Sequence, residues 1–187
     1  SLHGLPWRPG LFIDIQSAIG RPNEFSLDPK EIQLNFGLAE LVHRAHEKKW
    51  AVVLLVSQPA VGLGLISWAK FDQIIQQTLR LLAQKGAFVD HTICSVFNEK
   101  SLRAYGLVNA GTCLSSGGMF WDAIKNLRID RNQSVVVGSD HEFLQAGIRA
   151  GPMKAYFQLR PSETNLVNQD KVNPPILKLD NFDEVRL

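Results

Sequence analysis

An uninterrupted apolar run at positions 51–56, rich in valine, constrains the fold of this chain more than any other feature. A strand with one face in water alternates polar and apolar residues, whereas a strand of a parallel sheet covered by helices is apolar throughout. The apolar residues before this run follow helical spacing instead: Leu34, Leu38, Leu41, Val42 and Ala45. We therefore predict a buried parallel strand preceded by an amphipathic helix.

The same alternation of strand and helix continues along the chain. We expect further strands at 11–13, 88–94, 134–137 and 155–159, with a last strand or short helix within 176–185. Further helices are predicted from the N-cap Ser67 to a stop at Gly86, around 120–127 and around 144–148. This order is typical of right-handed βαβ units around a mainly parallel sheet, so the fold class is α/β.

Bulk properties limit the classes of function. The chain has 187 residues, 45% of them hydrophobic, 20% charged, and a formal net charge of +2. We interpret residues 1–187 as one domain, with a core of about 8–160 and a C-terminal edge segment of about 174–187. The small net charge argues against nucleic acid and membrane as partners. No signal peptide or membrane-spanning run is recognisable, and two cysteines suit a reducing compartment, so we expect a cytoplasmic protein.

Polar residues follow three of the predicted strands where each strand ends. They are found at 14–16, 57–58 and 138–142. In open parallel sheets, ligands bind outside the carboxyl ends of the central strands. The sequence therefore predicts that Asp14, Ser57 and Gly138 lie at the ends of adjacent strands, at the edge of a ligand site.

These strand ends resemble those of a known enzyme family. Residues 56–67, Val-Ser-Gln-Pro-Ala-Val-Gly-Leu-Gly-Leu-Ile-Ser, resemble a strand ending in Thr-Asn-Gln and the following Ser-Gly-Ile-Ala-Arg-Gly loop of the haloacid dehalogenase-like (HAD) phosphatases. The strand 11–14 and the segment 126–151 are similar to the first and last motifs of that family. The resemblance covers about residues 8–160. Within the family, the chain is most similar to the branch of histidinol phosphatases and heptose bisphosphate phosphatases. This resemblance implies a three-layer Rossmann-like fold with a minimal cap.

The resemblance also implies a chemistry. In the family an aspartate attacks phosphorus, a second aspartate two residues on protonates the leaving group, and Mg²⁺ offsets the negative charge. Asp14 stands at the nucleophile position, and Gln16, which cannot act as an acid, stands at the second. The residues matched to phosphate binding are Ser57, Gln58, Ser115 and Ser116. The family's phosphate-binding lysine has no counterpart in residues 113–119.

The late acidic motif of the family is also altered. Its two acids are replaced by Ser139 and Phe143, whereas Asp140 and Glu142 are acidic but displaced by one position. Asp140 and Glu142 are suited to cap the helix that follows, where the helix dipole favours acids. They are metal ligands, together with Asp14, only if the chain is an active, divergent enzyme.

Many members of the heptose phosphatase branch carry a zinc loop of the pattern Cys-x-His…Cys-x-Cys. The outer ligands match Cys94 and Cys113, but Val96 and Gly111 replace the inner two, with His91 the only spare donor nearby. Structural zinc prefers four ligands. We therefore expect no zinc.

Three functions stay open. The first is a pseudophosphatase, a phosphatase fold kept for binding a small phosphorylated ligand or for assembly with a protein, with no cofactor. The second is a divergent Mg²⁺-dependent phosphohydrolase that acts on a small sugar phosphate with Asp14 as nucleophile. The third is an unrelated α/β binding or nuclease-like domain, because residues 138–143 superficially resemble a strand end of some metal-dependent ribonucleases.

Overall fold

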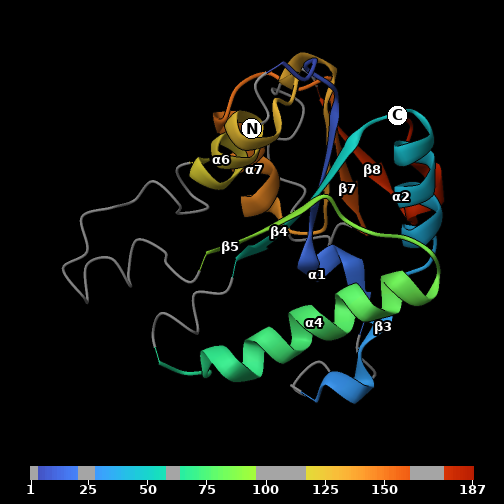
Figure 1. Ribbon diagram of the computed structural model, residues 1–187, viewed down its shortest axis with the longest axis vertical. Coiled ribbons are helices and arrows are strands. Elements are labelled where there is room, and N and C mark those ends of the chain that lie inside the picture. The colour runs from blue at the N-terminus through green and yellow to red at the C-terminus, as the bar shows by residue number, and fades with distance from the viewer. Residues whose placement is uncertain (1–3, 21–27, 58–63, 96–116, 161–174) are drawn as a thin grey trace.

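The computed structural model describes residues 4–20, 28–57, 64–95, 117–160 and 175–187 (Figure 1). Within these residues the main sheet has six strands in the order β5-β4-β1-β6-β7-β8, and every neighbouring pair is parallel. The strands are β1 (Gly10–Asp14), β4 (Ala51–Ser57), β5 (His91–Ser95), β6 (Val135–Gly138), β7 (Ala155–Leu159) and β8 (Ile176–Leu179). The predicted α/β class with a mainly parallel sheet is therefore confirmed.

Helices cover both faces of this sheet. The long ones are α2 (Leu38–Glu47), α4 (Trp68–Gln84), α6 (Gly118–Leu127) and α7 (His141–Arg149). Short elements complete the described chain: α1 (Ile15–Ala18), the strands β2 (Ile19–Gly20) and β3 (Gln33–Leu34), and the 3₁₀ turns η1 (Pro29–Glu31), η4 (Arg131–Gln133) and η7 (Phe182–Glu184). In Figure 1, α6 and α7 lie on one side of the sheet, and α2 and α4 lie on the other.

The sheet has a hydrophobic core on each of its two faces, and strand β1 contributes to both. Leu11 and Ile13 belong to the cluster that includes residues of α2 and α4, whereas Phe12 belongs to the cluster that includes residues of α6 and α7. All three side chains are buried. Successive side chains of a strand point to opposite faces, so a strand that contributes to both cores must be apolar at every position.

Most helix ends follow the local signals in the sequence. The Ser67 hydroxyl caps α4 by accepting a hydrogen bond from the Lys70 amide at 3.1 Å. Gly86, just after α4, has a φ of 69°, a left-handed conformation that glycine adopts at little cost.

Two predicted boundaries are wrong. Leu34 lies in β3 rather than in the following helix, because Gly37 adopts a φ of 82° and α2 begins at Leu38. The third strand begins at His91 rather than at residue 88. Phe88 instead stacks on His46 at a centroid distance of 4.2 Å and is 59% exposed. A local apolar pattern does not distinguish a strand residue from an exposed aromatic ring that packs on a neighbour.

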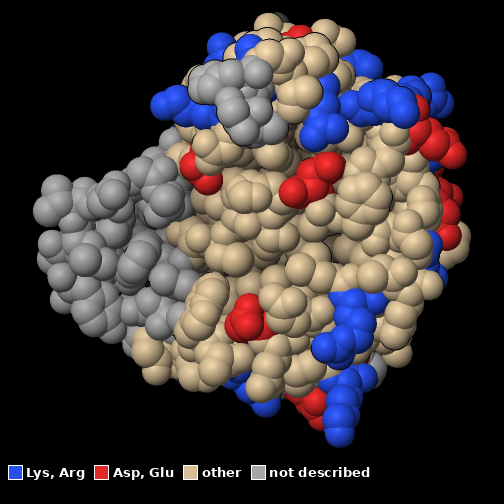
Figure 2. All heavy atoms as spheres, viewed as in Figure 1, with Lys and Arg blue, Asp and Glu red and all other residues tan. Residues whose placement is uncertain are grey.

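A small antiparallel pair lies beside the main sheet. Ile19 of β2 pairs with Leu34 of β3, and β3 contacts α4 (Figure 1). Figure 2 shows Lys and Arg gathered mainly at the upper rim and lower right of this view, with a largely uncharged middle. No helix among the described residues has the length and apolar character needed to cross a membrane.

Candidate functional site

The three predicted strand ends lie side by side. Strand β1 is between β4 and β6, so Asp14, Ser57 and Gly138 end three adjacent parallel strands. The register pairs Asp14 with Leu55, two residues before the end of β4. The predicted placement of these strand ends is therefore confirmed, and ligands of open parallel sheets bind at this carboxyl edge.

Asp14 is held tightly by the turn that follows it. One carboxylate oxygen, Oδ1, accepts a hydrogen bond from the Ser17 amide at 2.8 Å and so caps α1. The Ser17 hydroxyl donates to the Asp14 carbonyl at 2.9 Å. The other carboxylate oxygen, Oδ2, is buried and has no hydrogen-bond partner among the described residues. Only 5% of Asp14 is exposed, so this carboxylate is directed inward rather than into solvent.

Burial changes the acidity of this group. The pKa of Asp14 is raised from 3.8 to about 6, mainly by loss of hydration and to a smaller extent by the negative charge of Asp140. Interactions with Ser17 and with the backbone of Asp140 oppose this rise without cancelling it. Asp14 is therefore a carboxyl group that retains its proton more readily than an exposed aspartate.

Phe143 and the Asp14 carboxyl both lie next to Gly138 and line the same small pocket. A Cβ atom added to Gly138 would lie 2.5 Å from Cδ1 of Phe143 and 3.2 Å from Oδ2 of Asp14. The Phe143 ring packs on the Phe120 ring, with 5.3 Å between their centroids, and the Phe120 ring packs on the Phe12 ring, with 5.1 Å between theirs. Glycine at position 138 thus leaves room for both the carboxyl and the ring. Phe143 is itself part of the core, with 2% of its surface exposed.

The space next to Asp14 is consequently very small. We call it the Asp14 pocket; its volume is about 20 Å³. Its lining residues are Asp14, Ile15, Gln16, Leu55, Ser57, Asp140 and Phe143. A cavity of ~10–15 Å³ by this measure holds one water molecule, so the Asp14 pocket has room for about one.

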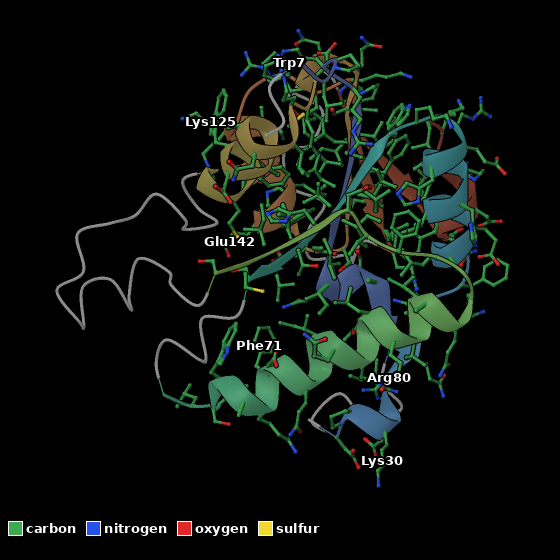
Figure 3. All side chains as sticks on the ribbon, in the orientation of Figure 1. Trp7, Lys30, Phe71, Arg80, Lys125 and Glu142 are labelled. Atoms are coloured by element: carbon green, nitrogen blue, oxygen red, sulfur yellow. The ribbon has the colours of Figure 1, made fainter. Side chains whose placement is uncertain are left out.

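A much larger hollow adjoins the Asp14 pocket, with which it shares Ile15, Gln16 and Ser57. We call it the Arg160 cavity; its volume is about 540 Å³. It is lined by Ile15, Gln16, Ser17, Ile19, Gly20, Asn35, Ser57, Phe71, Ile74, Ser139, Leu159 and Arg160. Figure 3 shows Phe71 directed from α4 toward the sheet. This volume falls within the ~300–1,000 Å³ typical of small-molecule sites.

The structure brings some predicted site residues together and separates others. Asp14, Gln16, Ser57 and Asp140 line the Asp14 pocket. Asp140 also caps α7 by accepting a hydrogen bond from the Glu142 amide at 3.0 Å. Glu142 is exposed at the start of α7 and does not line either space (Figure 3). The roles assigned to these residues stay predictions.

Other predictions fall outside the described residues. The structure does not describe three residues matched to phosphate binding: Gln58, Ser115 and Ser116. Nor does it describe three residues of the loop for which we expect no zinc: Val96, Gly111 and Cys113. Cys94, at the end of β5, is half-buried, and this burial raises the pKa of its thiol. Within the described ranges, no three His, Cys, Asp or Glu residues lie close enough to hold a metal ion.

Sequence reasoning missed three polar residues of the Arg160 cavity: Ser17, Asn35 and Arg160. Asn35 follows β3, and its side-chain amide donates to the Ser17 carbonyl at 2.6 Å. Arg160 directly follows β7. The rule that identified the other strand ends applies equally to Arg160, so its position after a predicted strand was a usable signal. Asn35 lies near the site only because β3 pairs with β2, and nothing in its local sequence indicates this.

Comparisons with known proteins give one consistent family. A D-glycero-β-D-manno-heptose-1,7-bisphosphate 7-phosphatase from Mesorhizobium japonicum is 28% identical over 146 residues, which cover 78% of this chain and 67% of that protein. A solved structure assigned to the HAD-like phosphatases, from Mesorhizobium loti, matches with a TM-score of 0.73 and 26% identity, over 84% of this chain and 75% of that one.

A second structure supports the fold assignment. The D,D-heptose 1,7-bisphosphate phosphatase from B. bronchiseptica, complexed with magnesium and phosphate, matches with a TM-score of 0.73 and 19% identity over 93% of both chains. No protein-family model matches the sequence.

Proposed function

We propose, from the premise that the relatives of this chain are HAD-superfamily phosphatases of the heptose bisphosphate phosphatase type, that it binds a small phosphorylated ligand and does not hydrolyse it. The phosphatase fold and the heptose phosphatase relationship are the starting point. The loss of turnover is our inference from the residues around Asp14.

The observation that supports this proposal most directly is the environment of Asp14. Three positions at which the family carries an acid are occupied by Gln16, Ser139 and Phe143, none of which is charged. The space beside the carboxyl is about 20 Å³. A phosphoryl group has a phosphorus atom and three oxygens, so it is several times larger than the single water that fits there. In-line attack by Asp14 requires phosphorus at close range, and the pocket beside Asp14, which Phe143 lines, has no room for a phosphoryl group.

The structure of the B. bronchiseptica relative contains magnesium, so the donors beside Asp14 decide whether this chain fits the same ion. Mg²⁺ demands octahedral oxygen coordination and keeps several of its waters. The described residues offer two carboxylates here, Asp14 and Asp140, and one oxygen of Asp140 already accepts the Glu142 amide. A pocket with room for about one water does not accommodate an octahedral ion with its ligands. These residues do not fit a magnesium site.

A binding role is supported by the adjoining Arg160 cavity. It has the size of a small-molecule site and combines amide and hydroxyl groups with an apolar wall. A chain that lost turnover by filling the pocket beside its nucleophile position retains this space. Binding without hydrolysis therefore accounts for both the small and the large hollow.

Phosphate release provides the test. The protein would be incubated with D-glycero-β-D-manno-heptose 1,7-bisphosphate and with other sugar phosphates, with and without Mg²⁺. We expect release at the background level, the same for the unmodified chain, for Asp14→Asn and for the matched control Asp122→Asn, which alters an exposed aspartate on α6. Mg²⁺-dependent release that Asp14→Asn abolishes and Asp122→Asn leaves intact would overturn the proposal.

That contrary outcome would support the second candidate, a divergent phosphohydrolase with Asp14 as nucleophile. One observation favours it: Oδ2 of Asp14 is buried without a hydrogen-bond partner among the described residues, as a reactive oxygen awaiting a substrate would be. The nearby Asp140 would then be the second acid. This candidate requires Phe143 to leave the pocket, at the expense of its packing with Phe120.

A further inference from the structure

The Arg160 cavity has an asymmetric charge distribution. Among the described residues that line it, Arg160 is positively charged and all the others are neutral. Gln16, Asn35, Ser57 and Ser139 provide amide and hydroxyl groups. Its apolar residues are Ile15, Ile19, Phe71, Ile74 and Leu159. The lining therefore favours a small anion with hydroxyl groups over a cation or a purely apolar molecule.

The backbone of Arg160 is held in an unusual conformation. Its φ is 44°, in the left-handed region that residues other than glycine rarely adopt. The conformation is fixed by a hydrogen bond from the Arg160 amide to the Leu179 carbonyl at 2.8 Å, at the end of the β7–β8 pair. A strained residue is retained where the surrounding structure compels it, often at a binding site. The position of Arg160 on the cavity wall is therefore set by the sheet itself.

A second hollow on the other side of Arg160 helps to define its charge environment. This hollow, of about 660 Å³, shares Gly20, Asn35 and Arg160 with the Arg160 cavity, and Asp180 also lines it. No described acid lies within ion-pair distance of the Arg160 guanidinium. The guanidinium is exposed and stands on a wall between a hollow with an acid and a cavity without one.

We infer that Arg160 binds the phosphate of a small phosphorylated sugar or polyol in this cavity, with the hydroxyl groups on the amide and hydroxyl side chains and the carbon skeleton against Phe71. Guanidinium binds phosphate through paired, charge-assisted hydrogen bonds. The phosphate then lies at the end of β7, two strands from Asp14 at the end of β1. The inference rests on the proposed function, because it names the ligand class and its anchoring residue.

The opposite placement, with phosphate at Asp14, is unfavourable. Asp14 and Asp140 are both acids, and two like charges in a partly desolvated site repel a phosphate dianion. The Asp14 pocket also has room for about one water. Charge and volume thus both place the anionic group at the Arg160 side of the cavity.

The test is a calorimetric titration of the full chain with mannose 6-phosphate, mannose and inorganic phosphate. We expect mannose 6-phosphate to bind more tightly than inorganic phosphate, and mannose not to bind measurably. Arg160→Gln should weaken mannose 6-phosphate binding by about tenfold or more, the effect of one lost charge-assisted interaction. The same charge change at an exposed site of α7, Arg149→Gln, should have no effect. Arg160→Lys should retain part of the affinity.

Two outcomes would overturn the inference. One is mannose 6-phosphate binding that Ser57→Ala weakens but Arg160→Gln does not, which would place the phosphate at the β4 end. The other is that mannose 6-phosphate, at millimolar concentration, binds no more tightly than mannose. Phosphate release is measured in the same samples, so failure of the proposed function can be distinguished from failure of the inference about Arg160. Turnover that depends on Asp14 would overturn the proposed function, and the Arg160→Gln titration would still decide where the phosphate binds.

Discussion

The two hollows at the carboxyl edge of the sheet differ in what lines them. The Asp14 pocket has a volume of about 20 Å³ and is lined in part by Phe143, whereas the Arg160 cavity has a volume of about 540 Å³ and combines amide, hydroxyl and guanidinium groups with an apolar wall. The pocket beside Asp14, the residue that the family resemblance matches to a nucleophile, is thus the one that packing has nearly filled. The cavity that adjoins it has kept the size and polarity of a ligand site.

The difference follows from which core each hollow borders. Phe143 is continuous with the aromatic packing of Phe120 and Phe12 on the α6–α7 side of the sheet. The Arg160 cavity borders the α4 side of the sheet, where it is lined by residues of α1, β2 and α4. An aromatic residue at the start of α7 therefore extends the core into the space beside Asp14. Filling this space is expected to stabilise the fold and to exclude the chemistry.

The largest expected effect comes from emptying the Asp14 pocket with Phe143→Ala. The side chain is 2% exposed and packs on Phe120, so we expect a loss of about 3–5 kcal/mol in the free energy of unfolding. The enlarged pocket should admit water to Asp14 and lower the pKa of this residue toward 3.8. Urea denaturation measures the first effect, and carboxyl-detected NMR titration measures the second.

A matched control is Phe36→Ala, because Phe36 is 70% exposed. Its loss of stability should stay within about 0.5 kcal/mol, as for surface substitutions in general. A comparable loss in both variants would mean that Phe143 does not fill the pocket as described.

A smaller effect, with a definite pH dependence, is expected from Asp14→Asn. The pKa of Asp14 is about 6 in the folded chain, above its ordinary value of 3.8, so the folded state binds this proton more tightly than the unfolded state. The stability of the unmodified chain should therefore decrease as pH rises from about 4 through about 6. Asn cannot ionise and can still accept the Ser17 amide, so it should add up to about 3 kcal/mol at pH 7 and nothing below about pH 4.

Denaturation of both proteins across this pH range measures the effect. Asp122→Asn is the control, since Asp122 is exposed and its variant should follow the unmodified chain at every pH. Parallel stability curves for Asp14→Asn and the unmodified protein would show that Asp14 is not desolvated.

The smallest expected effect concerns Asp140, which borders the Asp14 pocket and caps α7. Asp140→Ala removes the hydrogen bond from the Glu142 amide and should cost about 1 kcal/mol. It also removes a negative charge near Asp14, so the pKa of Asp14 should fall. Asp140→Asn separates the two effects, because Asn caps a helix as well as Asp does but carries no charge. A fall in stability with Asn equal to that with Ala would contradict the capping role.

Much of the fold could be predicted from residue patterns. The valine-rich run in β4 and the order of strands and helices established a parallel sheet, and Ser67 and Gly86 marked the ends of α4. The small β2–β3 pair was not predicted, because each of its strands has two residues and too little pattern to recognise. Leu34 was placed in a helix because its spacing fits one, although Gly37 fixes the true helix start.

The candidate site was predictable in part for the same reason. Asp14, Ser57 and Gly138 follow apolar runs, and parallel strands bring such residues to one edge. Arg160 satisfies the same condition but was overlooked, and Asn35 reaches the cavity through a strand pairing that no local signal announces.

The sequence by itself determined the parallel sheet, the edge at which its polar strand ends meet, and the absence of charge at Gln16, Ser139 and Phe143. These are properties of local pattern and residue type, which do not depend on distant contacts. Only the tertiary structure decided that Phe143 lines the small pocket beside Asp14 and that Arg160 lines the larger cavity next to it. The direction of a side chain and the volume left next to it depend on how helices pack over the sheet, and these are contacts between residues far apart in the chain.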